Sequence, residues 1–157
     1  MDLGSGTGRN LALLPDGTNA VAVDPSLDAL EWGRSRAPAV LRVVARAEDL
    51  PFRDATFDTV LSGLVFCSVA APGRALAEVK RVLRPDGSLR MLEHVRSRVP
   101  WRARLQDVIQ PMWTWAAGGC HPNRDTEATV QRAGFRIEED GHRAKADIRR
   151  FAATPTS

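Results

Sequence analysis

The chain has 157 residues, a formal net charge of +3, 43% hydrophobic residues and 26% charged residues. A chain of this length is the size of one domain, and its composition is typical of a globular protein, which argues against disorder. No apolar run approaches the roughly 18–20 residues that span a bilayer, and no basic-then-apolar signal segment opens the sequence. We therefore expect a cytoplasmic protein with no integral membrane segment.

The first half of the sequence opens with a glycine-rich stretch and then alternates between strand and helix patterns. The stretch precedes a run that can begin a helix. Ser26 is placed to cap the next helix. In chain order, the pattern predicts a glycine loop at residues 2–8, a strand at 20–24 and a helix at 26–37. Two strands follow, at residues 39–45 and within 57–69.

The second half continues this alternation. Pro85 and the turn after it stop one helix, and Gly134 suits the C-terminal cap of another. The pattern predicts a helix at residues 73–87, a strand at 88–95 and an irregular Trp-rich stretch at 96–119. A helix at residues 123–135 and two closing strands at 135–140 and 148–154 follow. This order of elements predicts one α/β domain, residues 1–157, with a doubly wound, mainly parallel sheet and helices on both faces.

In such folds the ligand binds at the turn that follows the first strand. A dinucleotide fingerprint needs its third glycine at position 9, which is Arg9, and the spacing here is G-x-G-x-G, completed by Gly8. Asp24 lies about 20 residues past the loop and can accept two hydrogen bonds from a ribose diol. Both NAD and S-adenosylmethionine offer this diol, but the chain has no tyrosine for the tyrosine–lysine pair of many small dehydrogenases.

The remaining features point to no further partner class. Arginines cluster at residues 96–104 and 143–150, where a solvated face is the more common interpretation. No nucleic-acid-binding motif is visible, so we expect no nucleic-acid partner. Cys67 and Cys120 are expected to be free thiols. Because the Cys120–His121 pair has no partner cluster in the sequence, we predict no metal site. The oligomeric state stays open.

Four motifs in order resemble those of class I S-adenosylmethionine-dependent methyltransferases (methyltransferase type 11 domain), of the broad type that includes ubiquinone-biosynthesis enzymes. The resemblance covers nearly the whole chain. The motifs are "DLGSGTG" (2–8), "AVDPS" (22–26), "AEDLPFRDATFDTVLS" (47–62) and "LAEVKRVLRPDG" (76–87). The resemblance implies a seven-stranded Rossmann-like sheet, with S-adenosylmethionine as cofactor and S-adenosylhomocysteine as product.

The same resemblance implies the residues of the cofactor site. The glycine loop would wrap the methionine and adenosine parts, Asp24 would hold the ribose hydroxyls, and the end of the fourth strand would line the passage to the substrate. Many relatives carry an aspartate where Arg46 stands, so Glu48 or the backbone must accept from the adenine amino group here. The implied cofactor residues are Asp2, Gly4, Ser5, Gly6, Gly8, Asp24, Pro25, Ser26, Ala47, Glu48, Ser62 and Leu64.

A narrower resemblance, carried by "LVFCSVAAPGRALAEVKRVLRPDGSLRMLEHV" and by residues 101–124, is to a bacterial branch related to the methyltransferase-like thiol S-methyltransferases. It implies a small, fairly apolar acceptor, with a thiol favoured. Phospholipid-amine and other small-molecule N- or O-methyltransferases are the alternative. His94 is the candidate general base. Candidate substrate residues, in a variable cap of about residues 96–122, are Trp101, Trp113, Cys120 and His121.

Relatives place several residues of strand, and usually one or more helices, before "DLG". Here only Met1 precedes Asp2. The resemblance therefore predicts a truncated first strand and truncated N-terminal helices, and it leaves open a cofactor-binding remnant without turnover.

Overall fold

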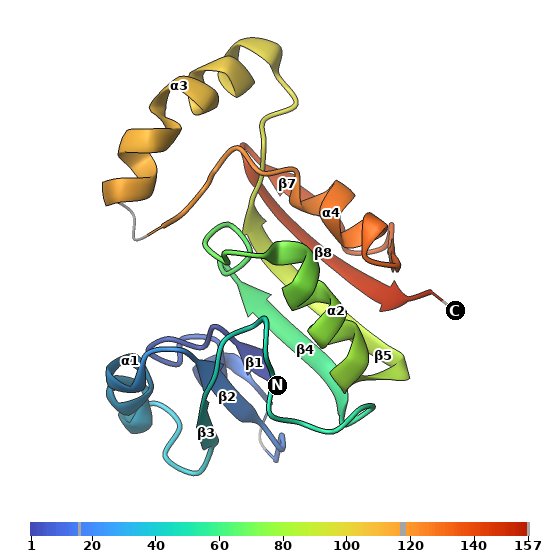
Figure 1. The fold of residues 1–157 in the computed structure, drawn as a ribbon. Helices are drawn as coiled ribbons and strands as arrows, with labels where there is room; N and C mark the ends of the chain where they lie inside the picture. Colours follow the sequence, from blue (N-terminus) through green and yellow to red (C-terminus); the bar gives the residue numbers. More distant parts are fainter. Residues whose placement is uncertain (16, 117–118, 157) are drawn as a thin grey trace.

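A computed structural model describes residues 1–15, 17–116 and 119–156 (Figure 1). One mixed sheet organises the chain. Its path is β3-β2-β1-β4-β5-β8-β6, and β7 pairs with β8 beside this path. The strands are β1 (Asp2–Leu3), β2 (Val21–Asp24), β3 (Leu41–Val44), β4 (Phe57–Gly63), β5 (Leu83–His94), β6 (Phe135–Ile137), β7 (Arg143–Lys145) and β8 (Ile148–Pro155).

The strand directions confirm the predicted doubly wound sheet. Strands β1 to β5 pair in parallel, whereas β8 runs antiparallel to β5, β6 and β7. The seven strands of the main path match the predicted number. The short β7 is an additional hairpin strand that the sequence analysis did not predict.

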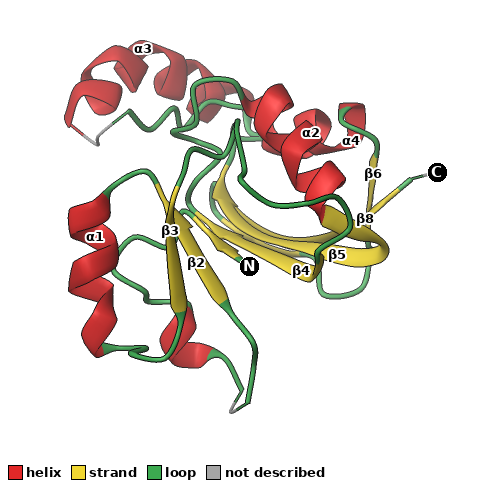
Figure 2. Cartoon of the chain, turned by 60° about the horizontal axis from the view of Figure 1, so that its bottom comes forward, coloured by secondary structure: helices red, strands yellow, loops and turns green. Residues whose placement is uncertain are grey.

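Helices lie on both faces of this sheet, as predicted. The helices are α1 (Leu27–Trp32), α2 (Pro72–Val82), α3 (Pro100–Ala116) and α4 (Thr126–Arg132), with 3₁₀ turns at Leu11–Leu13 and Gly33–Ser35. The Ser26 side chain accepts from the Ala29 N–H at 3.2 Å and begins α1, as the capping pattern predicts. Figure 2 shows α2 and α4 on one side of the sheet and α1 on the other.

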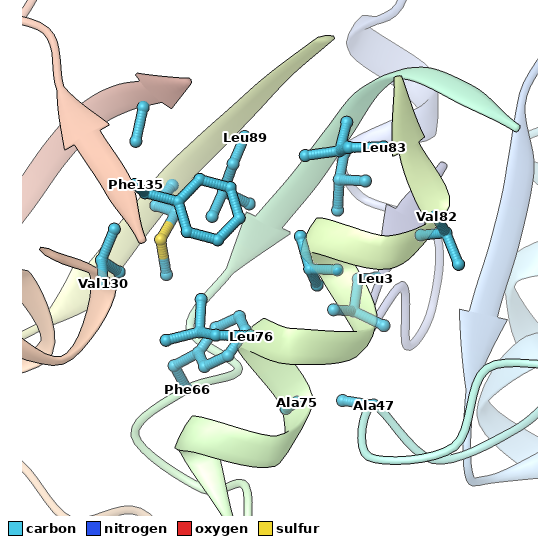
Figure 3. Close-up of a cluster of buried hydrophobic side chains, with 14 of the residues drawn as sticks. Leu3, Ala47, Phe66, Ala75, Leu76, Val82, Leu83, Leu89, Val130 and Phe135 are labelled. Atoms are coloured by element: carbon cyan, nitrogen blue, oxygen red, sulfur yellow. The ribbon is translucent and has the colours of Figure 1, made fainter. Parts of the chain in front are cut away.

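Two hydrophobic clusters hold the layers together. The larger lies between the sheet and the α2–α4 layer (Figure 3), and the smaller lies between β2, α1 and the first 3₁₀ turn. Ala22 belongs to the smaller cluster and Val23 to the larger, because successive strand residues point to opposite faces. Side chains labelled in Figure 3 include Leu3, Phe66, Leu76, Leu89, Val130 and Phe135.

Two helix predictions fail near prolines. The run after the glycine loop forms only the 3₁₀ turn at Leu11–Leu13, because Pro15 cannot donate the next helical hydrogen bond. The helix predicted within residues 73–87, with Pro85 as its stop, ends at Val82, and β5 begins at Leu83 in an extended conformation. Pro85 disfavours the helical conformation at Arg84, so the chain turns into the strand earlier than predicted.

The stretch predicted to be irregular contains the 17-residue helix α3. Pro111 lies inside this helix and obscured its pattern in the sequence. Within the described residues, no helix combines the length and apolar character needed to cross a membrane. Figure 1 shows α3 projecting from the carboxyl-end edge of the sheet.

Candidate functional site

A cavity of about 410 Å³ lies at the carboxyl ends of β1, β2 and β4, beside the loop that follows β3. From β1 the chain builds β2 and β3 on one side, and it then crosses to β4 and β5 on the other. Open α/β sheets bind ligands at such a switch point. The lining residues are Leu3, Gly4, Asp24, Pro25, Ala45, Arg46, Ala47, Glu48, Leu64, Val65, Ser68, Val69 and Ala70.

The glycine loop brings the backbone against this cavity. Gly4 has a φ of +64°, and a Cβ atom built there would lie 2.3 Å from Cγ2 of Val65. Only glycine combines this left-handed conformation with so close an approach. The Ser5 N–H donates to the Val23 carbonyl at 3.0 Å and fixes the loop to β2. The loop is thus a tight backbone cradle whose geometry excludes side chains at position 4.

Asp24 links the glycine loop to the start of α1. Its Oδ2 accepts from the Gly6 N–H and its Oδ1 from the Ser26 N–H, both at 2.9 Å. Each carboxylate oxygen has a second lone pair, so the side chain can still accept from hydroxyl groups of a ligand. The structure therefore brings the predicted ribose-binding aspartate to the cavity with fixed orientation.

Two further predicted residues, Asp2 and Ser5, are buried beside the cradle. Oδ1 of Asp2 accepts from Asn10 Nδ2 at 2.9 Å, while Oδ2 of Asp2 and Oγ of Ser5 lack a hydrogen-bond partner among the described residues. Burial raises the pKa of Asp2 above its usual range. Neither residue lines the 410 Å³ cavity, so the structure places Asp2 and Ser5 behind the surface that a ligand would contact there.

This donor and acceptor set fits S-adenosylmethionine. The cofactor carries an ammonium group, a ribose diol and an adenine amino group, all of which donate hydrogen bonds. Asp24 and Glu48 line the cavity and supply carboxylate acceptors, and Gly4 supplies close backbone approach. The residues present therefore match the group in chemistry.

Glu48 stays anionic beside the same cavity. Its Oε1 accepts from the Ala71 N–H at 3.2 Å, and its Oε2 lies 3.7 Å from Arg46 Nε. Burial would raise the pKa of Glu48, but backbone N–H groups, that of Ala71 among them, and the Arg46 charge lower it. This carboxylate is therefore available as an acceptor where the resemblance requires one.

Glu93 is a central residue that the sequence analysis missed as a site residue. It is fully buried in β5, where its Oε1 accepts from Ser62 Oγ at 3.0 Å and from the Val65 and Phe66 N–H groups. Its Oε2 lies 3.4 Å from the Cys67 N–H. Burial raises the pKa of Glu93, although these hydrogen bonds oppose the shift. The carboxyl group thus fixes the loop that lines one wall of the cavity.

This network also decides where two predicted residues lie. Leu64 lines the cavity, with a φ of +60°. Ser62 is buried and directed to Glu93, outside the set of lining residues. Pro25 and Ala47 line the cavity, whereas Ser26 caps α1 and Gly8 packs near Gly33.

The candidate base His94 lies close to both cysteines, Cys67 and Cys120. Its Nδ1 is 3.8 Å from Cys120 Sγ, and one ligand atom from each of Cys67, His94 and Cys120 lies within 4.8 Å of the others. Both cysteines are free, as predicted. Burial raises the pKa of the Cys67 thiol to about 12, and the nearby Glu93 charge adds to the increase, so this thiol is not a nucleophile at neutral pH.

The segment that follows α3 is tied to the loop after β4. The His121 N–H donates to the Cys67 carbonyl at 2.7 Å, and His121 Nδ1 lies 3.3 Å from the same oxygen. Arg124 Nη1 donates to the carbonyls of Phe66 and Val69 at 2.7 and 2.6 Å. These contacts place Cys120 beside the end of β5, so the predicted Cys120, His121 and His94 lie together.

The predicted tryptophans lie elsewhere. Trp101 is 66% exposed and Trp113 is 43% exposed on α3, and neither lines the 410 Å³ cavity. α3 is attached through Gln106, whose Nε2 donates to the carbonyls of Val95 and Pro122. The opposite side of the helix carries an exposed apolar stripe: Trp101, Leu105, Val108, Met112 and Trp115.

A larger hollow, of about 720 Å³, lies near α4 and β6. Three groups in its wall contact one another: Glu127 accepts from Arg98 at 3.1 Å and lies 2.6 Å from His142 Nε2. It also lies away from the carboxyl ends of β1, β2 and β3, so we assign the site to the smaller cavity.

Comparison with known proteins agrees with this geometry. The family description "Methyltransferase domain" matches residues 1–91. The chain is 35% identical over 144 residues to the thiol S-methyltransferase TMT1B of Rattus norvegicus, covering 86% of this chain and 59% of that protein. It is 37% identical over 111 residues to an uncharacterized methyltransferase of Mycobacterium tuberculosis, covering 69% of this chain and 45% of that protein.

Solved structures share the fold. An S-adenosylmethionine-dependent methyltransferase of Thermotoga maritima superimposes with a TM-score of 0.77 at 23% identity, covering 99% of this chain and 81% of that chain. The chain spans about 59% of the length of the thiol S-methyltransferases that it matches.

Proposed function

The chain belongs to the methyltransferase-domain family of S-adenosylmethionine-dependent methyltransferases, and from this we propose that it transfers a methyl group to a small, fairly apolar thiol. The observation that carries the proposal is the cavity at the switch point, which Gly4 and Asp24 line and where they would hold the cofactor. The identity to thiol S-methyltransferases supports a thiol as the acceptor.

The chain's own residues would bind and orient the reactants. When bound, S-adenosylmethionine would supply a methyl group on a cationic sulfonium: an acceptor thiolate would bond to the methyl carbon in line, the bond from that carbon to the sulfonium sulfur would break, and S-adenosylhomocysteine would leave. Asp24 would hold the ribose, and the loop that Glu93 fixes would close one wall and exclude water. Positioning and water exclusion account for most of such catalysis, so the site needs few reactive side chains.

His94 would promote loss of the acceptor's proton. Imidazole is the side chain that most readily accepts a proton near neutral pH. His94 lies at the end of β5 beside Cys120, and the next residue, His121, donates its N–H to the carbonyl of Cys67 in the cavity loop. His94 itself is not among the residues that line the 410 Å³ cavity. A thiol with an ordinary pKa near 8.5 needs only moderate assistance to ionise.

Calorimetric titration of the reduced chain with S-adenosylmethionine and S-adenosylhomocysteine tests the proposal. We expect micromolar binding, followed by formation of S-adenosylhomocysteine with small alkyl thiols. Turnover with amines or phenols instead would contradict the thiol assignment. Binding without any turnover would identify a remnant that retains only the cofactor site.

Replacing Asp24 by alanine should weaken cofactor binding by about 1–3 kcal/mol, because hydrogen bonds to a charged group are lost. Calorimetry on the folded variant measures the change. Asp28→Ala is the matched control, because this substitution removes the same charge. Asp28 is exposed in the first turn of α1 and does not line the cavity. Equal affinities for the wild type and Asp24→Ala would remove Asp24 from the site.

Replacing His94 by glutamine should lower thiol methylation about 100-fold at neutral pH and leave cofactor affinity unchanged. The deficit should shrink as the pH rises toward the thiol's own pKa, because the acceptor then ionises without assistance. Initial rates across a pH series measure this, with His142→Gln as a control on a histidine paired to Glu127. A loss of equal size at every pH would indicate a structural role for His94.

A further inference from the structure

Three potential metal ligands from separate parts of the sequence converge at one point. His94 ends β5, Cys67 lies in the loop after β4, and Cys120 follows α3. One atom from each lies within 4.8 Å of the others, and the Cys120 Sγ to His94 Nδ1 distance is 3.8 Å. Both thiols are buried and His94 is partly buried.

These separations approach those of a tetrahedral metal site. With zinc–sulfur bonds of about 2.3 Å and zinc–nitrogen bonds of about 2.0 Å, two sulfur ligands of a tetrahedral site lie about 3.8 Å apart, and a sulfur and a nitrogen ligand lie about 3.5 Å apart. The Sγ to Nδ1 distance of 3.8 Å is about 0.3 Å longer than the sulfur–nitrogen value, and the other separations, all within 4.8 Å, need a contraction of about 1.3 Å at most. Two thiolates and a neutral imidazole would also balance the charge of a divalent ion, as a buried site requires.

The backbone around the cluster holds the ligands in place. The His121 N–H bonds to the Cys67 carbonyl, and the Thr114 hydroxyl donates to the Cys120 carbonyl at 3.0 Å. The Cys67 N–H is 3.4 Å from a Glu93 oxygen. Because the affinity of a metal site depends on how firmly its ligands are held, these backbone contacts of Cys67 and Cys120 favour binding.

We propose that Cys67, His94 and Cys120 form a three-ligand binding site for a zinc-class divalent metal ion. Sulfur and imidazole ligands select zinc and related soft ions over calcium and magnesium. The sequence analysis predicted no metal because it considered only Cys120 and His121; in the fold His121 positions Cys67, and His94 completes the set.

Three protein ligands leave the fourth tetrahedral position for an outside ligand. Cys67 Sγ lies 3.5 Å from the Leu64 carbonyl and 3.6 Å from Ser68 Oγ, and both residues line the cofactor cavity. We infer that the acceptor thiol takes the fourth position on the metal, an inference that rests on the proposed function. Its S–H bond breaks, a sulfur–metal bond forms and the proton leaves to solvent, since a metal-coordinated thiol is deprotonated. In this state His94 is a metal ligand and not the base, so the general-base role proposed above applies to the metal-free chain.

The test titrates the full, reduced chain with Co²⁺, whose spectrum reports sulfur ligands and tetrahedral geometry. We expect one equivalent to produce sulfur-to-cobalt charge-transfer absorption and strong visible bands, and Zn²⁺ to displace it. Cys67→Ser, Cys120→Ser and His94→Gln should each weaken Co²⁺ binding by at least about 100-fold, the upper end for loss of an outer-shell contact. His142→Gln should bind Co²⁺ like the wild type.

Adding ethanethiol to the cobalt-loaded chain tests the fourth position, and a change in the visible bands is expected. Unchanged bands would overturn the thiol assignment. A folded wild-type chain without sulfur-to-cobalt absorption, or a Cys67–Cys120 disulfide in the natively purified chain, would overturn the metal site without relying on any variant. The spectra need neither cofactor nor turnover, so failure of methyl transfer with intact cobalt spectra would count only against the proposed function.

Discussion

Replacing Gly4 by alanine is expected to destabilise the protein by about 2–5 kcal/mol and to abolish measurable cofactor binding. The left-handed conformation at φ +64° alone costs an ordinary residue about 1–2 kcal/mol. The new Cβ would also lie 2.3 Å from Cγ2 of Val65 and 3.2 Å from its Cβ, so Val65 would have to shift as a whole residue. Its backbone N–H is held by Glu93, so that shift is opposed.

Two further variants separate the clash from the backbone effect. Gly141→Ala places alanine at a φ of +78° with no atom within 4 Å, and it should cost only the conformational part. Val65→Ala in the Gly4→Ala background removes the two closest atoms and should restore part of the loss. Urea unfolding and calorimetry measure stability and binding. If Gly4→Ala and Gly141→Ala have the same free energy of unfolding and the same cofactor affinity, the close approach of Gly4 to Val65 contributes to neither stability nor binding.

The glycine loop and Asp24 could be predicted from the sequence, because their positions depend on their spacing from nearby strands. The glycine loop and Asp24 each end a short strand, and the carboxyl ends of adjacent parallel strands meet at one edge of the sheet. Their convergence on one cavity therefore follows from the order of the elements. Ala47 and Glu48, which the resemblance assigned to the cofactor site, also line the cavity, because they follow the next strand.

The contacts that the sequence did not reveal are those between segments far apart in the chain. The sequence around Glu93 does not show that it accepts from N–H groups of the loop after β4. An acidic residue near the end of an apolar strand does indicate that its carboxyl group has a specific partner. The grouping of Cys67 with Cys120 depends on how α3 leads the chain back to the sheet. The helical pattern of that stretch was obscured by Pro111.

Removing the Glu93 side chain should destabilise the fold by about 3–5 kcal/mol. Glu93→Ala leaves the buried N–H groups of the cavity loop and the Ser62 hydroxyl without their acceptor. Each unsatisfied buried group costs about 1–3 kcal/mol, and entry of water into the loosened loop would recover part of that. A loss of this size is a large fraction of the typical stability of a domain, about 5–15 kcal/mol.

Glu139→Ala is the control, because it removes a carboxylate from an exposed position and should change the free energy of unfolding by less than about 0.5 kcal/mol. Urea unfolding of both variants under reducing conditions measures the difference. Since Val65 lines the cofactor cavity, Glu93→Ala should also weaken cofactor binding. Similar unfolding midpoints for the two variants would show that the loop does not depend on Glu93.

Glu93→Gln keeps the shape of the side chain and tests the ionisation of the carboxyl group. Because burial raises the pKa of Glu93 in the folded chain, the folded state keeps the proton to higher pH than the unfolded state does. The stability that Glu93 contributes is therefore complete below its unfolded pKa, about 4.3, and falls as the pH rises through the folded pKa. Glutamine does not titrate, so the advantage of the wild type over Glu93→Gln should be largest at low pH and should decrease on going to neutral pH. An advantage that grows with pH would mean that the hydrogen bonds from the loop outweigh burial and lower the pKa of Glu93.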